Sequence, residues 1–178
     1  MVEIYKTDNK VLQKLDNIEE GCWVNMIDPT SSELSLVSGY FEIDLADLAT
    51  ALDEEESSRI SLEDGYTLIL VDIPTPEVRH EKKMYTTIPL GIILKNDAII
   101  TICREDTPVL NYFVRNKLKE FSTKKKMRFI YEMMFRSAML YQAYLRGIDK
   151  KRTEIEERVG DDLSLIHISE PTRRRGIS

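Results

Sequence analysis

Carboxylates form the densest group of chemically capable side chains in this sequence. Asp44, Asp47 and the run Asp53-Glu54-Glu55-Glu56 fall within one short span. Hard cations prefer oxygen ligands, and Mg²⁺ usually keeps several waters while binding one or two protein carboxylates. The pattern makes Asp47 and Asp53 weak candidate ligands of a cation site, which can lie between subunits. We favour the simpler interpretation of a solvated helix end with repelling charges, and assign no metal ligand firmly.

Signals of catalysis are poor. Gly39 and Gly91 stand alone rather than in a Gly-rich phosphate loop, and no Ser lies in a Gly-x-Ser-x-Gly turn. A nucleophilic thiol needs a nearby base, whereas Cys22 and Cys103 lie inside apolar runs and are predicted to be packed core thiols. His80, the only histidine outside the C-terminal tail, lies in the polar segment 76–84 and is predicted to be a solvated surface residue. We predict no enzyme, no catalytic residue and no firmly bound cofactor.

Composition narrows the class of protein. The chain has 178 residues, of which 42% are hydrophobic and 31% charged, which favours one folded domain of ordinary size. The formal net charge of −6 does not suit a general nucleic-acid binder, although it suits a surface that attracts cations. The basic run Lys124-Lys125-Lys126 with Arg128 could contact phosphates, but a solvated helix start is the favoured interpretation.

Two isolated cysteines without a Cys-x-x-Cys spacing are typical of a reduced, cytosolic protein. No apolar run approaches the roughly 20 residues needed to span a bilayer. We therefore expect the chain as given to be soluble and cytoplasmic.

Strand alternation and turn residues predict the order of elements. Strands are expected over 2–6, 21–27, 59–62, 66–73, 85–94 and 98–103, and helices from 30 to about 38, from 44 to 52, from 107 to about 121 and from 127 to 159. Pro74 and Pro76 are expected to end one strand, and 9–20 is ambiguous. This order predicts an α+β or mixed α/β fold, with a mixed sheet flanked by helices (α/β/α) and a long C-terminal helical arm.

The last long run, Met127 to Val159, repeats apolar residues every seven positions. Such a stripe is typical of a helix that packs against other helices. We divide the chain into a domain over 1–122, the start of a helical arm over 123–162 and a tail over 163–178. The tail lacks the seven-residue step and resembles the translation of a sequencing-library adapter, so we exclude it from fold reasoning. A genuine basic terminus is the alternative. The exclusion implies a fragment of a gene that continues past about Asp162.

Several short segments follow one another in a specific order: Trp23-Val24-Asn25-Met26, Asp28-Pro29-Thr30, Leu52-Asp53 with Arg59-Ile60, Pro89 to Leu94, Ile99 to Ile102, Ile148-Asp149 and Glu154 to Val159. Together they resemble the CorA-like divalent cation transporters, and the resemblance extends from Met1 to about Asp162. Each motif alone mostly encodes strand and turn geometry, so their order and spacing carry the resemblance.

The resemblance implies the cytosolic regulatory and assembly domain of a Mg²⁺ or related divalent cation channel-transporter. It implies a homopentamer, attached to the cell membrane through C-terminal helices that are missing here, with the domain on the cytoplasmic side. Mg²⁺ would be the transported or regulatory ion, and its binding between subunits would favour the closed state. The family's Gly-Met-Asn signature is absent from this sequence.

One departure from the family concerns its regulatory metal site. Many members carry Glu-Asp in the second helix, where this sequence has Ala49 and Thr50, and an Asp on the arm, where it has Phe135. Either other carboxylates such as Asp47 or Asp53 serve, or Mg²⁺ does not gate this branch in that way. A different class of function, a stand-alone soluble module that oligomerises through the 127–159 helix, is the alternative.

Overall fold

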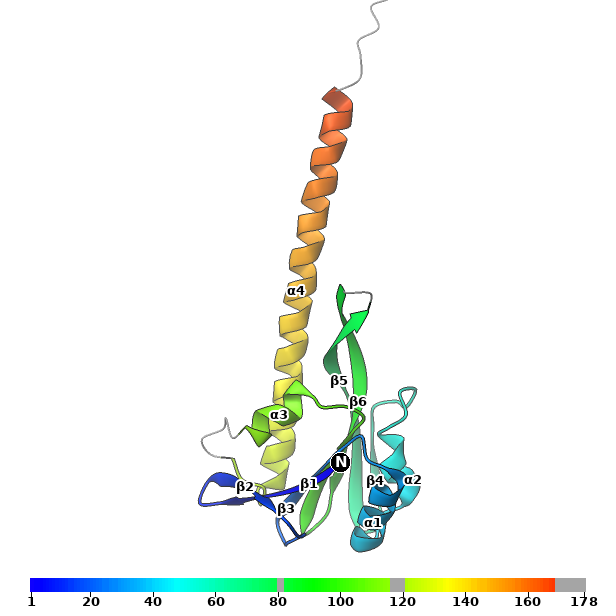
Figure 1. The fold of residues 1–178 in the computed structure, drawn as a ribbon, viewed down its shortest axis with the longest axis vertical. Helices are drawn as coiled ribbons and strands as arrows, with labels where there is room; N and C mark the ends of the chain where they lie inside the picture. The colour runs from blue at the N-terminus through cyan, green and yellow to red at the C-terminus, as the bar shows by residue number, and fades with distance from the viewer. Residues whose placement is uncertain (80–81, 116–120, 169–178) are drawn as a thin grey trace, which may run out of the picture. The chain divides into compact units, whose positions relative to one another are not determined.

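The computed structural model describes the backbone of residues 1–79, 82–115 and 121–168. Seven strands form one mixed sheet in the order β2-β1-β3-β7-β6-β5-β4. The strands are β1 (Val2–Asp8), β2 (Val11–Leu15), β3 (Cys22–Ile27), β4 (Arg59–Glu63), β5 (Tyr66–Arg79), β6 (Lys82–Leu94) and β7 (Ala98–Cys103). The helices are α1 (Ser31–Phe41), α2 (Leu45–Thr50), α3 (Pro108–Val114) and α4 (Lys126–Ile168). Figure 1 shows their arrangement, which confirms the predicted mixed sheet flanked by helices.

The centre of the sheet is its parallel pair, β3 with β7; every other neighbouring pair is antiparallel. Both strands are apolar almost throughout, as expected for strands covered on both faces. Their polar side chains form a short chain of hydrogen bonds: the Trp23 indole donates to the Thr101 hydroxyl at 2.8 Å, and that hydroxyl donates to the Asn25 side-chain oxygen at 2.9 Å. All three side chains are fully buried. The predicted Trp-Val-Asn-Met strand is therefore joined to β7 by side-chain hydrogen bonds as well as by backbone hydrogen bonds.

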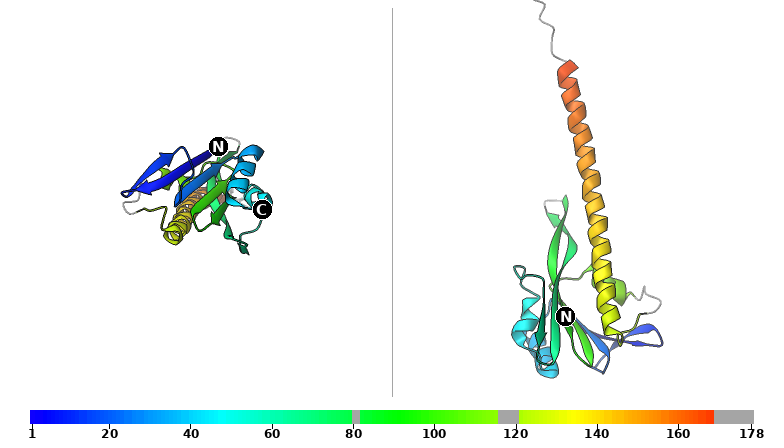
Figure 2. Two further views of the ribbon diagram at one scale, coloured as in Figure 1. Left: turned by 90° about the horizontal axis from the view of Figure 1, so that it is seen from below. Right: turned by 180° about the vertical axis from the view of Figure 1, so that it is seen from behind.

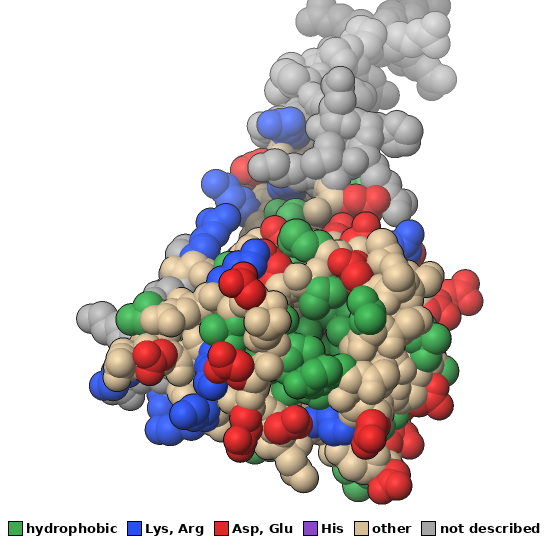
Figure 3. All heavy atoms as spheres, turned by 60° about the horizontal axis from the view of Figure 1, so that its bottom comes forward, with side chains coloured by type: hydrophobic (Ala, Val, Ile, Leu, Met, Phe, Trp, Pro, Cys, Tyr) green, Lys and Arg blue, Asp and Glu red, His purple; other side chains and the backbone are tan. Residues whose placement is uncertain are grey.

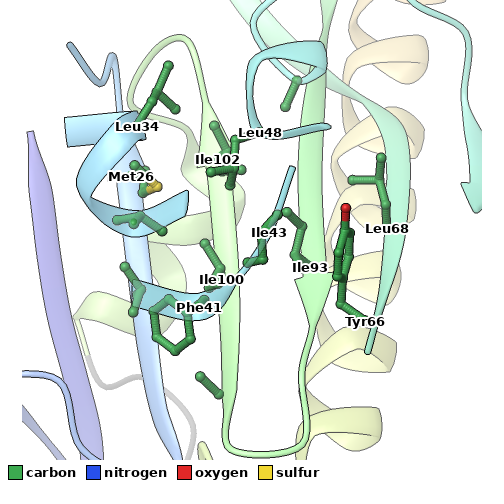
Figure 4. Packing of buried hydrophobic residues seen from close by; sticks show 14 of the residues in the cluster. Met26, Leu34, Phe41, Ile43, Leu48, Tyr66, Leu68, Ile93, Ile100 and Ile102 are labelled. Carbon is green, nitrogen blue, oxygen red and sulfur yellow. The ribbon is translucent and has the colours of Figure 1, made fainter. Parts of the chain in front are cut away.

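The helices α1 and α2 cover one face of the sheet (Figure 2). Alternate residues of the strands point into this layer, where they meet the apolar sides of the two helices and of the segment between them (Figure 4). The labelled members of this cluster are Met26, Leu34, Phe41, Ile43, Leu48, Tyr66, Leu68, Ile93, Ile100 and Ile102. Because α2 has only six residues, its stability depends on this packing rather than on helix propensity.

The opposite face packs against α3 and the first turns of α4, and its core is aromatic. The rings of Phe113 and Phe129 meet the Trp23 ring edge-on, with centroids 6.4 Å and 5.0 Å away. Phe129 and Met133 are each 1% exposed. The first turns of the predicted arm thus belong to the core of the domain.

Each of the three short helices begins at a side-chain cap. Thr30 and Glu33 form a reciprocal capping box before α1. The Asp44 carboxylate accepts from the Ala46 N–H at 2.9 Å before α2. Thr107 caps α3, with proline at its first helical position.

The main departures from the sequence predictions concern four elements, β2, β5, α3 and α4. Strand β5 continues through Pro74 and Pro76 to Arg79. Its pairing with β4 ends at Leu70, so the outer edge of β5 beyond that residue has no strand neighbour among the described residues. The two prolines, two positions apart, place their missing N–H on that same side, where no ladder bond is lost. The polar segment predicted around His80 is mostly paired strand, and His80 itself lies outside the described residues.

The other three differences concern length. The ambiguous 9–20 segment contains β2, reached through a turn in which Asn9 and Lys10 adopt positive φ. Helix α3 ends at Val114 rather than near Phe121. Helix α4 continues to Ile168, past the predicted end at Val159; the origin of 163–178 stays a prediction.

Contacts divide the chain into a first unit, Met1–Leu140, and a second unit, Tyr141–Ser178. The first unit contains the sheet, the three short helices and the beginning of α4. Among the described residues, no helix is long and apolar enough to cross a membrane.

Gly91 controls how closely α2 lies on the sheet. A Cβ added there would come within 2.5 Å of the Ala51 Cβ, at the C-terminal end of α2. We predict that Gly91→Ala lowers the free energy of unfolding by about 1–3 kcal/mol, because the helix must move away. Gly39→Ala is the control: it is exposed in α1 with nothing within 4 Å, and should stabilise by about 0.5–1 kcal/mol. Urea unfolding of both variants measures the difference, and equal stabilities would contradict the close approach.

Candidate functional site

The acidic segment predicted as a weak cation site lies on α2 and the turn that follows it. The structure gives its carboxylates separate partners. Asp44 is occupied as the cap of α2. Asp53 accepts from the Glu55 N–H at 3.0 Å, which closes a local turn. These two carboxylates therefore organise backbone rather than converge on a common point.

Two further members of the acidic run pair with basic side chains. Glu54 pairs with Arg104 and Glu56 pairs with Arg59. Both pairs are solvent-accessible, so their contribution to stability is small. On the face drawn in Figure 3, Asp and Glu side chains are dispersed around an apolar patch rather than gathered at one place. Within the part of the chain that the structure describes, no three His, Cys, Asp or Glu residues form a group that could hold a metal ion.

Asp47 has the most specific environment of the acidic residues. Its carboxylate accepts a hydrogen bond from the Tyr66 hydroxyl at 2.5 Å. The same hydroxyl accepts from the Asp44 N–H at 3.3 Å, so Tyr66 of β5 connects the sheet to the first turn of α2. Burial first, and then the bond to Asp47, raise the pKa of Tyr66 to about 12. No sequence pattern points to this partner of Asp47, because the two residues lie on different elements.

The positions that align with the family's regulatory carboxylates carry other chemistry. The Thr50 hydroxyl donates to the Ala46 carbonyl at 2.8 Å within α2, and Ala49 is exposed. Phe135 is 44% exposed and its ring stacks against Tyr131. An apolar side chain offers no ligand to Mg²⁺. Asp47 and Asp53 remain predictions as ligands, although each already has a protein donor.

The basic run at the start of α4 is partly structural. The Lys126 ammonium donates to the Lys95 and Asn96 carbonyls at 2.6 Å and 2.5 Å. Lys124 lays its aliphatic chain over Gly21. Lys124 and Lys126 line an open cleft of about 730 Å³ between the start of α4 and the β4–β5 and β6–β7 turns. Lys126 thus anchors the helix to the β6–β7 turn.

Cys22 and Cys103 are buried free thiols. Burial raises the pKa of Cys103 to about 11 and also raises that of Cys22. A thiol held neutral is a poor nucleophile, which agrees with their prediction as core residues.

Comparison with known proteins agrees with this architecture. A family model described as CorA-like Mg²⁺ transporter protein matches residues 19–173. A curated relative, the cobalt/magnesium transport protein CorA of Methanocaldococcus jannaschii, is 29% identical over 136 residues, which cover 74% of this chain and 40% of that protein.

Solved structures share the fold. The soluble domain of CorA from M. jannaschii superimposes with a TM-score of 0.74 at 23% identity, covering 89% of this chain and 64% of that one. The complete CorA magnesium transporter of the same organism gives 0.69 at 20% identity, covering 89% and 50%. The ZntB cytoplasmic domain from Vibrio parahaemolyticus gives 0.63 at 11% identity, covering 85% and 63%. This chain spans less than two thirds of the length of each of these proteins.

Titration of Tyr66 tests the link between the sheet and α2. Its folded-state pKa near 12 lies above the value of about 10 expected for an unfolded tyrosine. The neutral phenol therefore stabilises the fold fully below about pH 10, and this contribution is lost as pH rises toward 12. We predict that Asp47→Asn lowers the pKa of Tyr66, because the charged acceptor disappears, while burial keeps it above that of an exposed tyrosine.

Phenolate absorbance of the wild type minus that of Tyr66→Phe isolates this one titration. The control is Asp53→Asn, which changes a carboxylate of the same segment and should leave the Tyr66 curve in place. Ionisation of Tyr66 together with the exposed tyrosines would contradict the bond.

Proposed function

Because this chain belongs to the CorA-like Mg²⁺ transporter family, we propose that it is the cytosolic regulatory and assembly domain of a divalent cation channel-transporter. The family is one of transporters and not of enzymes. The observation that carries the proposal is the family match over 19–173 together with the fold of the CorA soluble domain. The pore would be supplied by other parts of a longer, membrane-bound protein, with this domain on the cytoplasmic side.

Helix α4 is the element best suited to transmit a change from the domain. It starts in the core, where Phe129 and Met133 are buried, and it is one helix of 43 residues, about 65 Å long at 1.5 Å per residue. A change in the aromatic layer next to Trp23 would therefore act directly on the first turns of α4. Exposed apolar residues farther along α4, including Leu145, Ile148 and Ile155, suit packing against further helices in a homopentamer.

Regulation in this protein would not use the family's usual intersubunit carboxylates, since Ala49, Thr50 and Phe135 occupy those positions. Asp47 is engaged by Tyr66 and Asp53 by its own turn. A cation gates a channel only through a difference in its affinity for the open and closed states. We therefore propose that Mg²⁺ acts on this protein chiefly as the transported ion rather than as a ligand of this domain.

Thermal unfolding of the isolated chain tests the regulatory part of the proposal. With a dissociation constant above about 10 mM, 10 mM Mg²⁺ would stabilise the fold by less than about 0.4 kcal/mol. We thus expect a rise in Tm of no more than about 1–2 °C. A titration with NaCl at matched ionic strength corrects for screening. Stabilisation by several degrees at sub-millimolar Mg²⁺ would show a specific site and contradict this expectation.

Transport itself is tested with the complete reading frame that contains this chain. Reconstituted into liposomes loaded with a Mg²⁺-sensitive dye, the complete protein should admit Mg²⁺ down its gradient. The 178-residue chain, added at the same protein-to-lipid ratio, is the matched control and should admit none. Absence of divalent cation entry with the complete, correctly folded protein would overturn the proposed function.

A further inference from the structure

Strand β4 is an outer strand of the sheet with an unusually apolar surface. Among the described residues, β5 is the only strand beside it. Ile60 and Leu62 are 69% and 83% exposed. They share one face, next to Ile69 and Thr67 of β5. An exposed apolar outer strand is a ready template for pairing with another chain, and proteins usually protect such edges with charges, bulges or proline.

The backbone of β4 is also oriented for pairing. Glu63 and Tyr66 are paired residues that close a two-residue turn. Hydrogen-bonded and non-hydrogen-bonded pairs alternate along antiparallel strands, and the pair that closes such a turn is hydrogen-bonded. The N–H and C=O groups of Leu62 and Ile60 therefore point away from β5, toward the free edge. The two most exposed apolar residues are the two whose backbone is available.

The sequence of this strand, Arg59-Ile60-Ser61-Leu62-Glu63, complements itself when two copies run antiparallel about Ser61. Arg59 then stands opposite Glu63 of the second copy, and Ile60 opposite Leu62 of the second copy. The same register brings the outward-pointing backbone groups of Ile60 and Leu62 together. Opposite charges and apolar residues placed directly across two strands both stabilise a sheet. Charge, side-chain type and backbone orientation thus agree on one register.

The other outer strand, β2, does not have these properties. An antiparallel pairing of two copies of Val11–Leu15 would set Leu12 opposite Lys14, an apolar residue against a charged one. Lys14 is moreover held by Glu3 of β1 at 2.7 Å. The combination of features is therefore specific to β4.

We propose that two copies of this chain associate through antiparallel pairing of their β4 strands, which joins their sheets into one. Arg59 already pairs with Glu56 of its own chain, so in the dimer its guanidinium lies between an intramolecular and an intermolecular carboxylate. The geometry fits a second copy because the strand is complementary to its own sequence. The proposal is independent of transport, since it concerns an edge of the soluble sheet.

Sedimentation of the 178-residue chain over a range of concentrations tests the dimer. Leu62→Lys should raise the dimer dissociation constant at least tenfold, because two lysines per dimer enter the apolar pair. Leu36→Lys is the matched control: Leu36 is 73% exposed on α1, and its replacement should change the constant less than twofold. Should Leu62→Lys fail to fold, Leu62→Thr serves instead. Equal effects at positions 62 and 36, or a wild-type chain that stays monomeric at every soluble concentration, would overturn the proposal.

Charge reversal tests the register. Arg59→Glu alone sets Glu opposite Glu63 twice in each dimer, and Glu63→Arg alone sets Arg opposite Arg59 twice. Each variant should dimerise at least tenfold more weakly than the wild type. An equimolar mixture of the two restores both opposite-charge pairs in the heterodimer, and should recover dimerisation.

If a variant dimerised weakly only because it failed to fold or lost the Arg59–Glu56 pair, mixing the two variants would not restore dimerisation. Concentration-dependent protection of the Ile60 and Leu62 amides from hydrogen exchange should accompany the dimer. If the mixture dimerised no more tightly than either variant alone, this register would be excluded.

Discussion

The parallel pairing of β3 with β7 is the constraint on which the rest of this domain depends. It places two almost wholly buried strands at the centre of the sheet, and the Trp23–Thr101–Asn25 chain of hydrogen bonds holds them in register. A parallel pair cannot be closed by a tight turn, so a long connection must cross the sheet. Here that connection contains α1, α2 and β4 to β6. The two helices of this connection, α1 and α2, cover one face of the sheet. On the other face, Trp23 lies at the base of an aromatic layer against which α3 and α4 pack.

Much of this arrangement could be predicted from local chemistry. The capping residues Thr30, Asp44 and Thr107 bond to backbone N–H groups only two or three residues away. Their effect can therefore be recognised from the local sequence. The predictions that failed depended on a neighbour. Whether Pro74 ends a strand is decided by which edge of β5 is unpaired, and that depends on where β4 stops. The β1–β2 hairpin was ambiguous because its turn uses Asn9 and Lys10 rather than glycine at positive φ.

The acidic segment illustrates why a group of carboxylates in a sequence is a weak predictor of a metal site. Its members are close along the chain, yet helix and turn geometry direct them to different donors: a backbone N–H for Asp53, a phenol for Asp47 and an arginine for Glu54. The Tyr66 contact could not be anticipated, since it requires knowing which face of β5 lies under α2. By contrast, the absence of acidic residues at positions 49, 50 and 135 is plain from the sequence once the family alignment is made. Among the residues that the structure describes, no group of three His, Cys, Asp or Glu residues forms a cation site in their place.

The close approach at Gly91 has a consequence for how this domain meets its surroundings. Because Gly91 has no side chain, the Ala51 Cβ lies where a Cβ of residue 91 would otherwise be. A movement of α2 toward β6 is therefore opposed at this point, whereas a movement away from the sheet is not. If acidic residues were introduced at positions 49 and 50, the length of their side chains, rather than a movement of α2 relative to the sheet, would determine whether a neighbouring subunit could share an ion.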